Sequence, residues 1–191
     1  MALAFFRLSM TDDGCQRIVD SSCAEAMINS FISHSKDDKH MKREDGLYLT
    51  HLLSAFTNLT FSDYSIAPLL GKGAIANFNK IIGEKYVGEI MREEHKQKIQ
   101  ELSLRVLGNM SLNHEGKQEC IDSEVILNAW KYLDSTVYEE RLNASLILMS
   151  CTIHLQGKQQ YVMCENDVQD QLIVGANPLI IKKTIEKLQE K

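Results

Sequence analysis

The sequence predicts an all-α fold, a right-handed helical solenoid of about four repeats that forms a single domain over residues 1–191. One pattern occurs twice, in LSAFTNLTFSDYSIAPLL at 53–70 and in LRVLGNMSLNHEGKQECI at 104–121. Both segments read Leu-x-x-x-x-Asn-apolar-Ser/Thr, then a polar stretch and an apolar pair. Helical apolar spacing dominates the rest of the chain, and only short apolar runs are compatible with strands.

The repeat has a long and variable period. Ser9, Thr60 and Ser111 are 51 residues apart (60 − 9 and 111 − 60), and the next match, Thr152, follows after 41 residues (152 − 111). A period near 40 with two or three helices per unit is typical of HEAT and armadillo repeats. The longer units carry charge-rich additions at 34–46 and 84–98, which we interpret as surface loops or over-long helix starts. For the charge-rich loops at 36–45 and 92–98, a contact with tubulin or another subunit is the alternative to solvated surface.

Each unit is expected to contain a long helix with an apolar stripe, a polar turn and a short helix. The first stripe has the spacing i, i+3, i+4, i+7, i+10, and consists of Leu49, Leu52, Leu53, Phe56 and Leu59. Where the first stripe has Leu52, the later units have Ser103 and Ala144, which would allow close helix packing. The short helices are expected to begin near Gly14, Ser65, Gly116 and Gly157.

The two ends of the array differ in character. MALAFF matches the end of a long helix, so Leu3, Phe5 and Phe6 are expected to pack against a neighbour. Missing upstream repeats are the alternative, which leaves open whether Met1 is the native start. Asn177 and Pro178 predict the start of an amphipathic capping helix. The predicted division is a partial repeat at 1–10, repeats at about 11–61, 62–112 and 113–153, and a capping unit at 154–191.

Composition excludes several classes of function. A net charge of −5 argues against a nucleic-acid partner, and no apolar run reaches the roughly 18 residues that a membrane span needs. The five cysteines are odd in number and form no C-x-x-C pair, which favours reduced thiols in a cytoplasmic protein. We expect no metal, cofactor or small-molecule substrate. GKGAI at 71–75 lacks the further residues of a phosphate loop and predicts a turn with a positive-φ glycine instead.

Three segments resemble armadillo repeats: LSLRVLGNMSLNHEGKQECIDSEVI, KREDGLYLTHLLSAFTNLTFSDYSIAPLLGKGAI and, more weakly, YEERLNASLILMSCTIHLQGKQQYV. The resemblance covers nearly the whole chain and implies a non-catalytic scaffold for protein–protein interaction. RLNAS at 141–145 and two Gly-Lys-Gln turns further resemble the armadillo proteins of ciliary radial spokes, in their C-terminal part. That likeness implies a structural subunit of the axoneme with other axonemal or radial-spoke proteins as partners.

Candidate partner-binding residues follow from the repeat. Arg7, Asn58, Asn109 and Ser150 are equivalent and form a polar ladder on the long helices, which line the concave face of an armadillo solenoid. Their side chains can bind a partner's backbone, or they can bond locally and only link repeats.

Nuclear-import adaptors of this family have a peptide-clamping Trp four residues before the groove Asn. Here Ser54 and Arg105 occupy that place, and Trp130, the sole tryptophan, lies in a different helix. Arg105 would repel a basic ligand, unless it simply pairs with Glu101 at i, i+4. Two other functions stay open: a soluble cytosolic adaptor that binds an extended peptide in its groove, and an enzyme that uses a groove cysteine.

Overall fold

The computed structural model describes residues 1–35, 43–83 and 93–164, and these residues form helices, turns and no strand. The predicted all-α class is therefore confirmed. In chain order the elements are α1 (Ala2–Leu8), α2 (Asp12–Asp20), α3 (Cys23–Ser35), α4 (Arg43–Leu59), α5 (Asp63–Ile66), η1 (Ala67–Leu69), α6 (Ala74–Gly83), α7 (Glu93–Leu112), α8 (His114–Asp122), α9 (Val125–Ala129), η2 (Trp130–Tyr132) and α10 (Tyr138–Cys151). A further helical segment covers 155–164.

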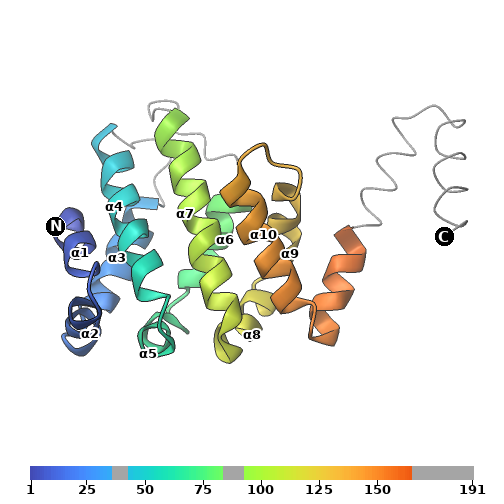
Figure 1. Cartoon of the computed structure of the whole chain (residues 1–191), viewed down its shortest axis with the longest axis horizontal. Helices are drawn as coiled ribbons and strands as arrows, with labels where there is room; N and C mark the ends of the chain where they lie inside the picture. Colours follow the sequence, from blue (N-terminus) through green and yellow to red (C-terminus); the bar gives the residue numbers. More distant parts are fainter. Residues whose placement is uncertain (36–42, 84–92, 165–191) are drawn as a thin grey trace, which may run out of the picture.

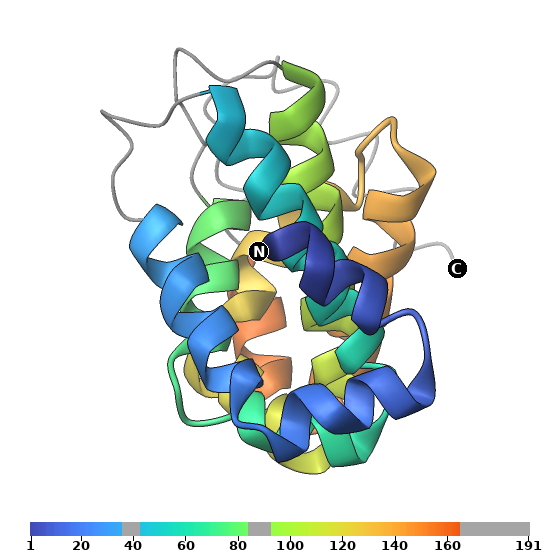
Figure 2. The same ribbon diagram turned by 90° about the vertical axis from the view of Figure 1, so that its left-hand side faces the viewer.

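The helices stack as an armadillo-type solenoid. The long helices α4, α7 and α10 lie side by side after α1 and form one face of the molecule (Figure 1). Behind them lie α3, α6 and α9, and the short helices α2, α5 and α8 close the lower edge. Figure 2, seen from the N-terminal end, shows these successive units stacked behind one another. Because each long helix packs against the preceding one, neighbouring units share one core.

The short helices begin two residues before the glycines that mark them in the sequence. α2 begins at Asp12, and the Thr11 Oγ1 accepts a hydrogen bond from the Gly14 backbone N–H at 3.1 Å. α8 begins at His114, where the Asn113 Oδ1 accepts from the N–H of Glu115 at 3.0 Å and of Gly116 at 3.2 Å. These side chains satisfy N–H groups that have no partner within the helix.

The glycines in these first turns permit a close backbone crossing. A Cβ on Gly14, Gly116 or Gly157 would lie 1.8, 2.3 or 2.2 Å from a carbonyl oxygen at the end of the preceding long helix. Real side chains do not tolerate such distances. The repeated glycine therefore lets the short helix cross directly over the end of the long one.

The turn after each short helix uses a left-handed residue at the same repeat position. Ser22, Gly73 and Glu124 have φ values of 57°, 73° and 55°, and they are 51 residues apart (73 − 22 and 124 − 73). Gly71 also has a positive φ of 67°, so the predicted turn is found at 71–73, whereas Ala74 and Ile75 of GKGAI begin α6. A positive φ strains Ser and Glu, so the packing of the units imposes this backbone conformation.

The predicted apolar stripe of the first long helix is confirmed, because all five of its side chains are fully buried. Ser103 and Ala144, the small residues expected to allow close packing, are also buried, on α7 and α10. The largest buried side chains belong to an aromatic cluster of Phe31, Phe56 and Phe78, whose ring centroids are 4.9–5.9 Å apart. One continuous core thus links α3, α4 and α6 across a unit boundary.

Several sequence-based predictions fall partly outside the described residues. Of the two charge-rich additions, 36–42 and 84–92 lie outside. Residues 34 and 35 end α3, and residues 43–46 and 93–98 begin the long helices α4 and α7. Asn177, Pro178 and the rest of 165–191 also lie outside. The helices α2–α4, α5–α7 and α8–α10 form successive triplets, and the boundaries that divide the chain into repeats stay a prediction.

The N-terminal helix α1 occupies the place of a long-helix end. Phe5 and Phe6 are half-buried against the core, and the Phe6 ring stacks on His51 of α4 with centroids 6.0 Å apart. Leu3 points outward with 41% of its surface exposed. Phe5 and Phe6 thus pack against this chain's own core. The contact of this edge with a neighbouring protein stays a prediction, and Leu3 is the residue exposed for it.

Candidate protein-interaction surface

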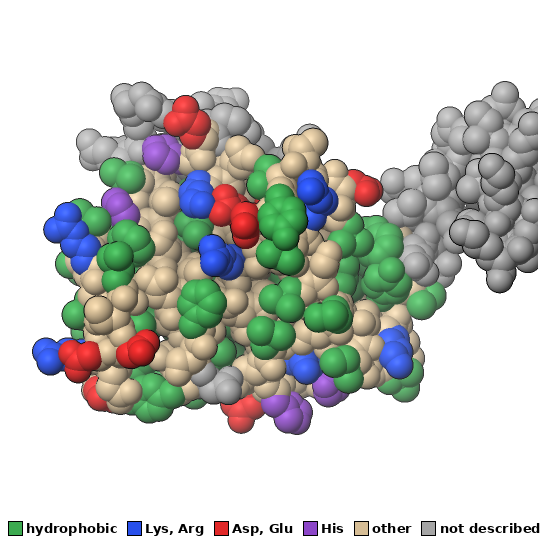
Figure 3. Space-filling view, viewed as in Figure 1, with side chains coloured by type: hydrophobic (Ala, Val, Ile, Leu, Met, Phe, Trp, Pro, Cys, Tyr) green, Lys and Arg blue, Asp and Glu red, His purple; other side chains and the backbone are tan. Residues whose placement is uncertain are grey.

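A stripe of partly exposed side chains runs across the three long helices, and we call it the long-helix face. Helical spacing of four residues places its members on one side of each helix: Thr50, Ser54 and Asn58 of α4, Glu101, Arg105 and Asn109 of α7, and Leu142 of α10. Figure 3 looks onto the side of the molecule formed by these helices and shows hydrophobic, basic and acidic side chains mixed on it. This face therefore offers both apolar and polar contacts.

The polar ladder predicted from the sequence bonds across unit boundaries. The Asn58 Nδ2 donates to the Ser9 Oγ at 3.1 Å. One unit later, the Asn109 Nδ2 donates to the Thr60 Oγ1 at 3.1 Å. In the next unit, the Ser150 Oγ donates to the Ser111 carbonyl. Each bond runs from one long helix to the end of the preceding long helix, so the ladder links repeats.

These links use the Nδ2 groups of Asn58 and Asn109 and leave the Oδ1 atom of each side chain available. The Asn109 Nδ2 also donates to the Thr57 carbonyl at 3.4 Å, which fixes the amide orientation because a carbonyl can only accept. In the part of the chain that the structure describes, no donor bonds the Oδ1 of Asn58 or Asn109, and both residues are half-buried. Each Oδ1 can accept a hydrogen bond from a partner.

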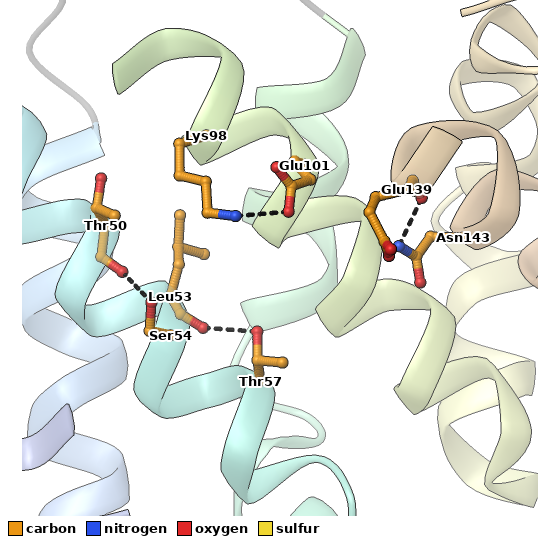
Figure 4. Close-up of polar contacts among 8 residues, drawn as sticks. All are labelled: Thr50, Leu53, Ser54, Thr57, Lys98, Glu101, Glu139 and Asn143. Atoms are coloured by element: carbon orange, nitrogen blue, oxygen red, sulfur yellow. Dashed lines mark hydrogen bonds and ion pairs between the residues drawn. The ribbon is translucent and has the colours of Figure 1, made fainter. Parts of the chain in front are cut away.

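The other ladder and groove residues have different surroundings. Ser150 is buried and its hydroxyl is used within the chain, whereas Arg7 is exposed at the N-terminal edge. The Ser54 hydroxyl donates to the Thr50 carbonyl of its own helix at 2.8 Å (Figure 4). Thr57 bonds Leu53 in the same way at 2.9 Å. Such local bonds hold the hydroxyls along α4 and leave the amides as the outward-facing polar groups.

The expected pairing of Glu101 with Arg105 does not form. The Glu101 carboxylate instead pairs with the Lys98 ammonium at 2.6 Å, one turn earlier on α7 (Figure 4). The Cζ of Arg105 lies 6.0 Å from the centroid of the Phe61 ring, within the range of a cation–π contact. No carboxylate among the described residues lies within ion-pair distance of Arg105. Arg105 is thus a half-buried cation supported by an aromatic ring.

Sequence reasoning missed Phe61 and its equivalents. The residue after the equivalent Ser or Thr of each unit is apolar and mostly exposed, at Met10, Phe61, Leu112 and Ile153. An apolar side chain in the core is explained by its burial, but apolar side chains that are exposed at the same position of every unit indicate a contact surface. Aligning the repeats shows that this position is apolar in all four units. These side chains add an apolar contact per unit beside the polar ladder.

Removing the Asn109 amide should weaken the contact between units. Asn109→Ala deletes the bonds to Thr57 and Thr60, and a typical intramolecular hydrogen bond contributes about 0.5–1.5 kcal/mol. We expect the free energy of unfolding to fall by about 1 kcal/mol in urea denaturation. Arg105→Ala, on the same face without such a bond, is the control. An unchanged stability in Asn109→Ala would show that the amide does not link the units.

The cysteines of the described residues lie in the core or away from the long-helix face. Cys120, Cys151 and Cys164 are buried, Cys15 on α2 and Cys23 on α3 are half-buried, and no disulfide joins any of them within the described ranges. Burial, with a contribution from Asp12, raises the pKa of the Cys15 thiol. The hydrogen bond from Cys120 lowers the pKa of Cys151, but that side chain is fully covered by the core. None of the described cysteines is exposed on the long-helix face.

Comparisons with known proteins bear on the fold. No protein-family model and no curated protein matches the sequence. Among solved structures, computationally designed armadillo repeat proteins for modular peptide recognition align with a TM-score of 0.66 at 15% identity, over 97% of this chain and 72% of theirs. An engineered protein aligns with a TM-score of 0.67 at 14% identity, over 95% of this chain and 40% of its own.

No helix within the described ranges has the length and apolar character that would let it span a bilayer. The same ranges contain no cluster of three His, Cys, Asp or Glu side chains suited to a metal ion. At identities of 14–15% the structural likeness concerns the fold alone. This chain therefore has the architecture of an armadillo-type solenoid.

Proposed function

We propose that this chain is a non-catalytic scaffold that binds an extended segment of a partner protein along the long-helix face. The observation that carries the proposal is the pair of half-buried amide oxygens on Asn58 and Asn109, at the same position of successive units. Their Nδ2 groups are held by the preceding unit, so the acceptors are fixed before a partner arrives. The alignment with designed armadillo proteins described as made for peptide recognition supports this function.

The proposed mechanism uses preorganised acceptors. An extended chain presents backbone N–H groups that no internal helix or sheet satisfies, and these can donate to the two Oδ1 atoms. Side chains bound in a fixed orientation lose little entropy on binding, which raises affinity. The exposed Phe61 follows the end of α4 by two residues and the exposed Leu112 is the last residue of α7, so both would contact apolar side chains of the same segment.

The partner segment is expected to carry a carboxylate. Arg105 lies one helical turn from Asn109 on α7, and its charge is not neutralised by any described side chain. The ring of Phe61 supports the guanidinium and leaves its N–H edge available for bidentate bonds to a carboxylate. An arginine in this place selects against the basic ligands that a tryptophan clamp would accept.

A peptide-display selection against the folded chain tests this proposal. A random library of extended peptides should yield sequences that contain acidic and apolar residues. Selected peptides should lose binding to the Asn58→Ala/Asn109→Ala variant, measured at 25 °C by fluorescence anisotropy. Failure to enrich any sequence, or peptides that bind this double variant as tightly as the wild type, would contradict the proposal.

Charge reversal at Arg105 should abolish the preference for acidic peptides. Arg105→Glu replaces a favourable contact by like-charge repulsion, so we expect the Kd of a selected acidic peptide to rise at least tenfold, about 1.4 kcal/mol. The effect should shrink as salt is added, because salt screens exposed charges. Lys80→Glu, exposed on α6 and outside the long-helix face, makes the same charge change as a control. Equal weakening by both variants would assign the effect to net charge alone.

The finer part of the proposal places this scaffold in a ciliary axoneme, in a radial spoke or a related complex. Its support is a sequence resemblance to the armadillo proteins of ciliary radial spokes, carried by RLNAS at 141–145 and by the Gly-Lys-Gln turns at 116–118 and 157–159. Salt-washed axonemes from ciliated cells provide the test by mass spectrometry. Retention that is lost in a strain without radial spokes would support this placement. Recovery only from the soluble fraction would favour the free cytosolic adaptor.

A further inference from the structure

An open groove lies at the C-terminal end of the described solenoid. It has a volume of about 550 Å³ and a mostly apolar lining that comes from α10, from the 155–164 helical segment and from Leu133. Together, α10 and its C-cap residue Thr152 contribute a stripe at i, i+3, i+4 and i+7, formed by Ser145, Leu148, Met149 and Thr152. Met149 has 65% of its surface exposed, which is unusual for a large apolar side chain in a packed stripe.

The repeat shows what normally covers this stripe. The equivalent residues of α7, which precede by 41, are Leu104, Leu107, Gly108 and Ser111, and all are buried. Those of α4, a further 51 residues earlier, are Leu53, Phe56, Thr57 and Thr60, and all are buried as well. α7 covers the stripe of α4, and α10 covers the stripe of α7. The groove on α10 therefore lies where the long helix of a following unit would pack.

The remaining sequence contains a segment that matches this site. PLIIKKTIEKLQEK at 178–191 has 14 residues, the same length as α10. Ile181, Ile185 and Leu188 are spaced i, i+4 and i+7, so in a helix they would share one face. Lys occupies positions 182, 183, 187 and 191 and Glu occupies 186 and 190, whereas Leu179 and Ile180 add apolar side chains at the start of the segment. The 13 residues at 165–177 can span at most about 43 Å, enough to return along a 14-residue helix of about 21 Å.

We propose that residues 178–191 dock as a helix into the α10 groove, with Ile181, Ile185 and Leu188 against Leu148, Met149 and Tyr161. The segment would do for α10 what α7 does for α4, and its Lys and Glu side chains would give the array a polar end. The α10 groove would thus be the surface that the predicted capping unit covers. This proposal concerns the end of the solenoid and is independent of binding on the long-helix face.

Photo-crosslinking in the full chain tests the contact directly. A p-benzoylphenylalanine at position 149 in place of Met149 should form its main crosslink within 178–191 of the same molecule, identified by peptide mass spectrometry. The same probe in place of Phe61, exposed in another unit, should give no such product. A crosslinked dimer would assign the groove to a second copy of the chain. That result, or products that omit 178–191, would overturn the proposal.

A pair of aspartate substitutions provides a second test on the unmodified groove. Ile185→Asp places a charge on the apolar side of the segment, whereas Lys183→Asp makes the same new residue on the polar side. We expect Ile185→Asp to speed amide hydrogen exchange in 155–164 at least fivefold and to lower the thermal midpoint. Lys183→Asp should leave both unchanged. Equal behaviour of the two variants would contradict docking through Ile185.

Discussion

Replacing Phe56 by alanine is expected to lower the free energy of unfolding by about 3–5 kcal/mol. The Phe56 side chain is fully buried, and its ring meets Phe31 at 5.9 Å and Phe78 at 5.6 Å, both edge-on. The substitution removes the transfer free energy of the ring and its aromatic contacts, and it leaves a cavity between α3, α4 and α6. Urea denaturation followed by circular dichroism measures the loss.

Phe61→Ala is the matched control for this substitution. Phe61 lies five residues further along the chain with 67% of its surface exposed, so its removal should change the stability by less than about 0.5 kcal/mol. The same change should weaken peptide binding, because the ring supports Arg105. If Phe56→Ala were no more destabilising than Phe61→Ala, the aromatic cluster would not be the centre of the core.

Gly116→Ala is expected to lower the free energy of unfolding by about 1–3 kcal/mol. Its Cβ would lie 2.3 Å from the Met110 carbonyl oxygen and 3.1 Å from the carbonyl carbon. Because both atoms belong to the backbone, α8 must move away from the end of α7. Helix propensity alone would make the alanine variant more stable than the glycine wild type, so a lower free energy of unfolding would be due to the clash.

Gly108→Ala makes the same change within α7. There the nearest atoms to the new Cβ are the Asn143 Oδ1 and the Leu146 Cδ2, both at 3.4 Å, an ordinary contact. We therefore expect Gly108→Ala to keep or slightly raise the thermal midpoint, whereas Gly116→Ala lowers it. A Gly116→Ala chain as stable as the wild type would mean that the short helix does not need the close crossing.

The sequence predicted the features that depend on periodic apolar burial. The stripe from Leu49 to Leu59 and the 51-residue spacing of Ser9, Thr60 and Ser111 both arise because each unit must cover its neighbour in the same way. The left-handed residues Ser22 and Glu124 could not be predicted in this manner, since neither residue type favours a positive φ. Their conformation is imposed by how the short helix meets the next one.

The sequence indicated which residues belong to the candidate surface, but not which atoms they contact. Asn58 and Asn109 were identified from the repeat, but the division of each amide between a linking Nδ2 and an available Oδ1 depends on Ser9, Thr57 and Thr60. The contact of Arg105 with Phe61 joins residues 44 positions apart (105 − 61), while helical spacing alone favoured Glu101 as its neighbour. Contacts between units depend on how the helices stack, which local sequence does not specify.

Hydroxyl-radical footprinting of the chain, alone and saturated with a selected peptide, tests most directly whether the long-helix face is the interface. The chain has two exposed aromatic reporters close in sequence: Phe61, beneath Arg105, and Tyr64 of α5, which bonds Asp20 of α2 at 2.5 Å. We predict that bound peptide protects Phe61 from oxidation and leaves Tyr64 unchanged. Protection of Tyr64 with continued oxidation of Phe61 would contradict binding on the long-helix face.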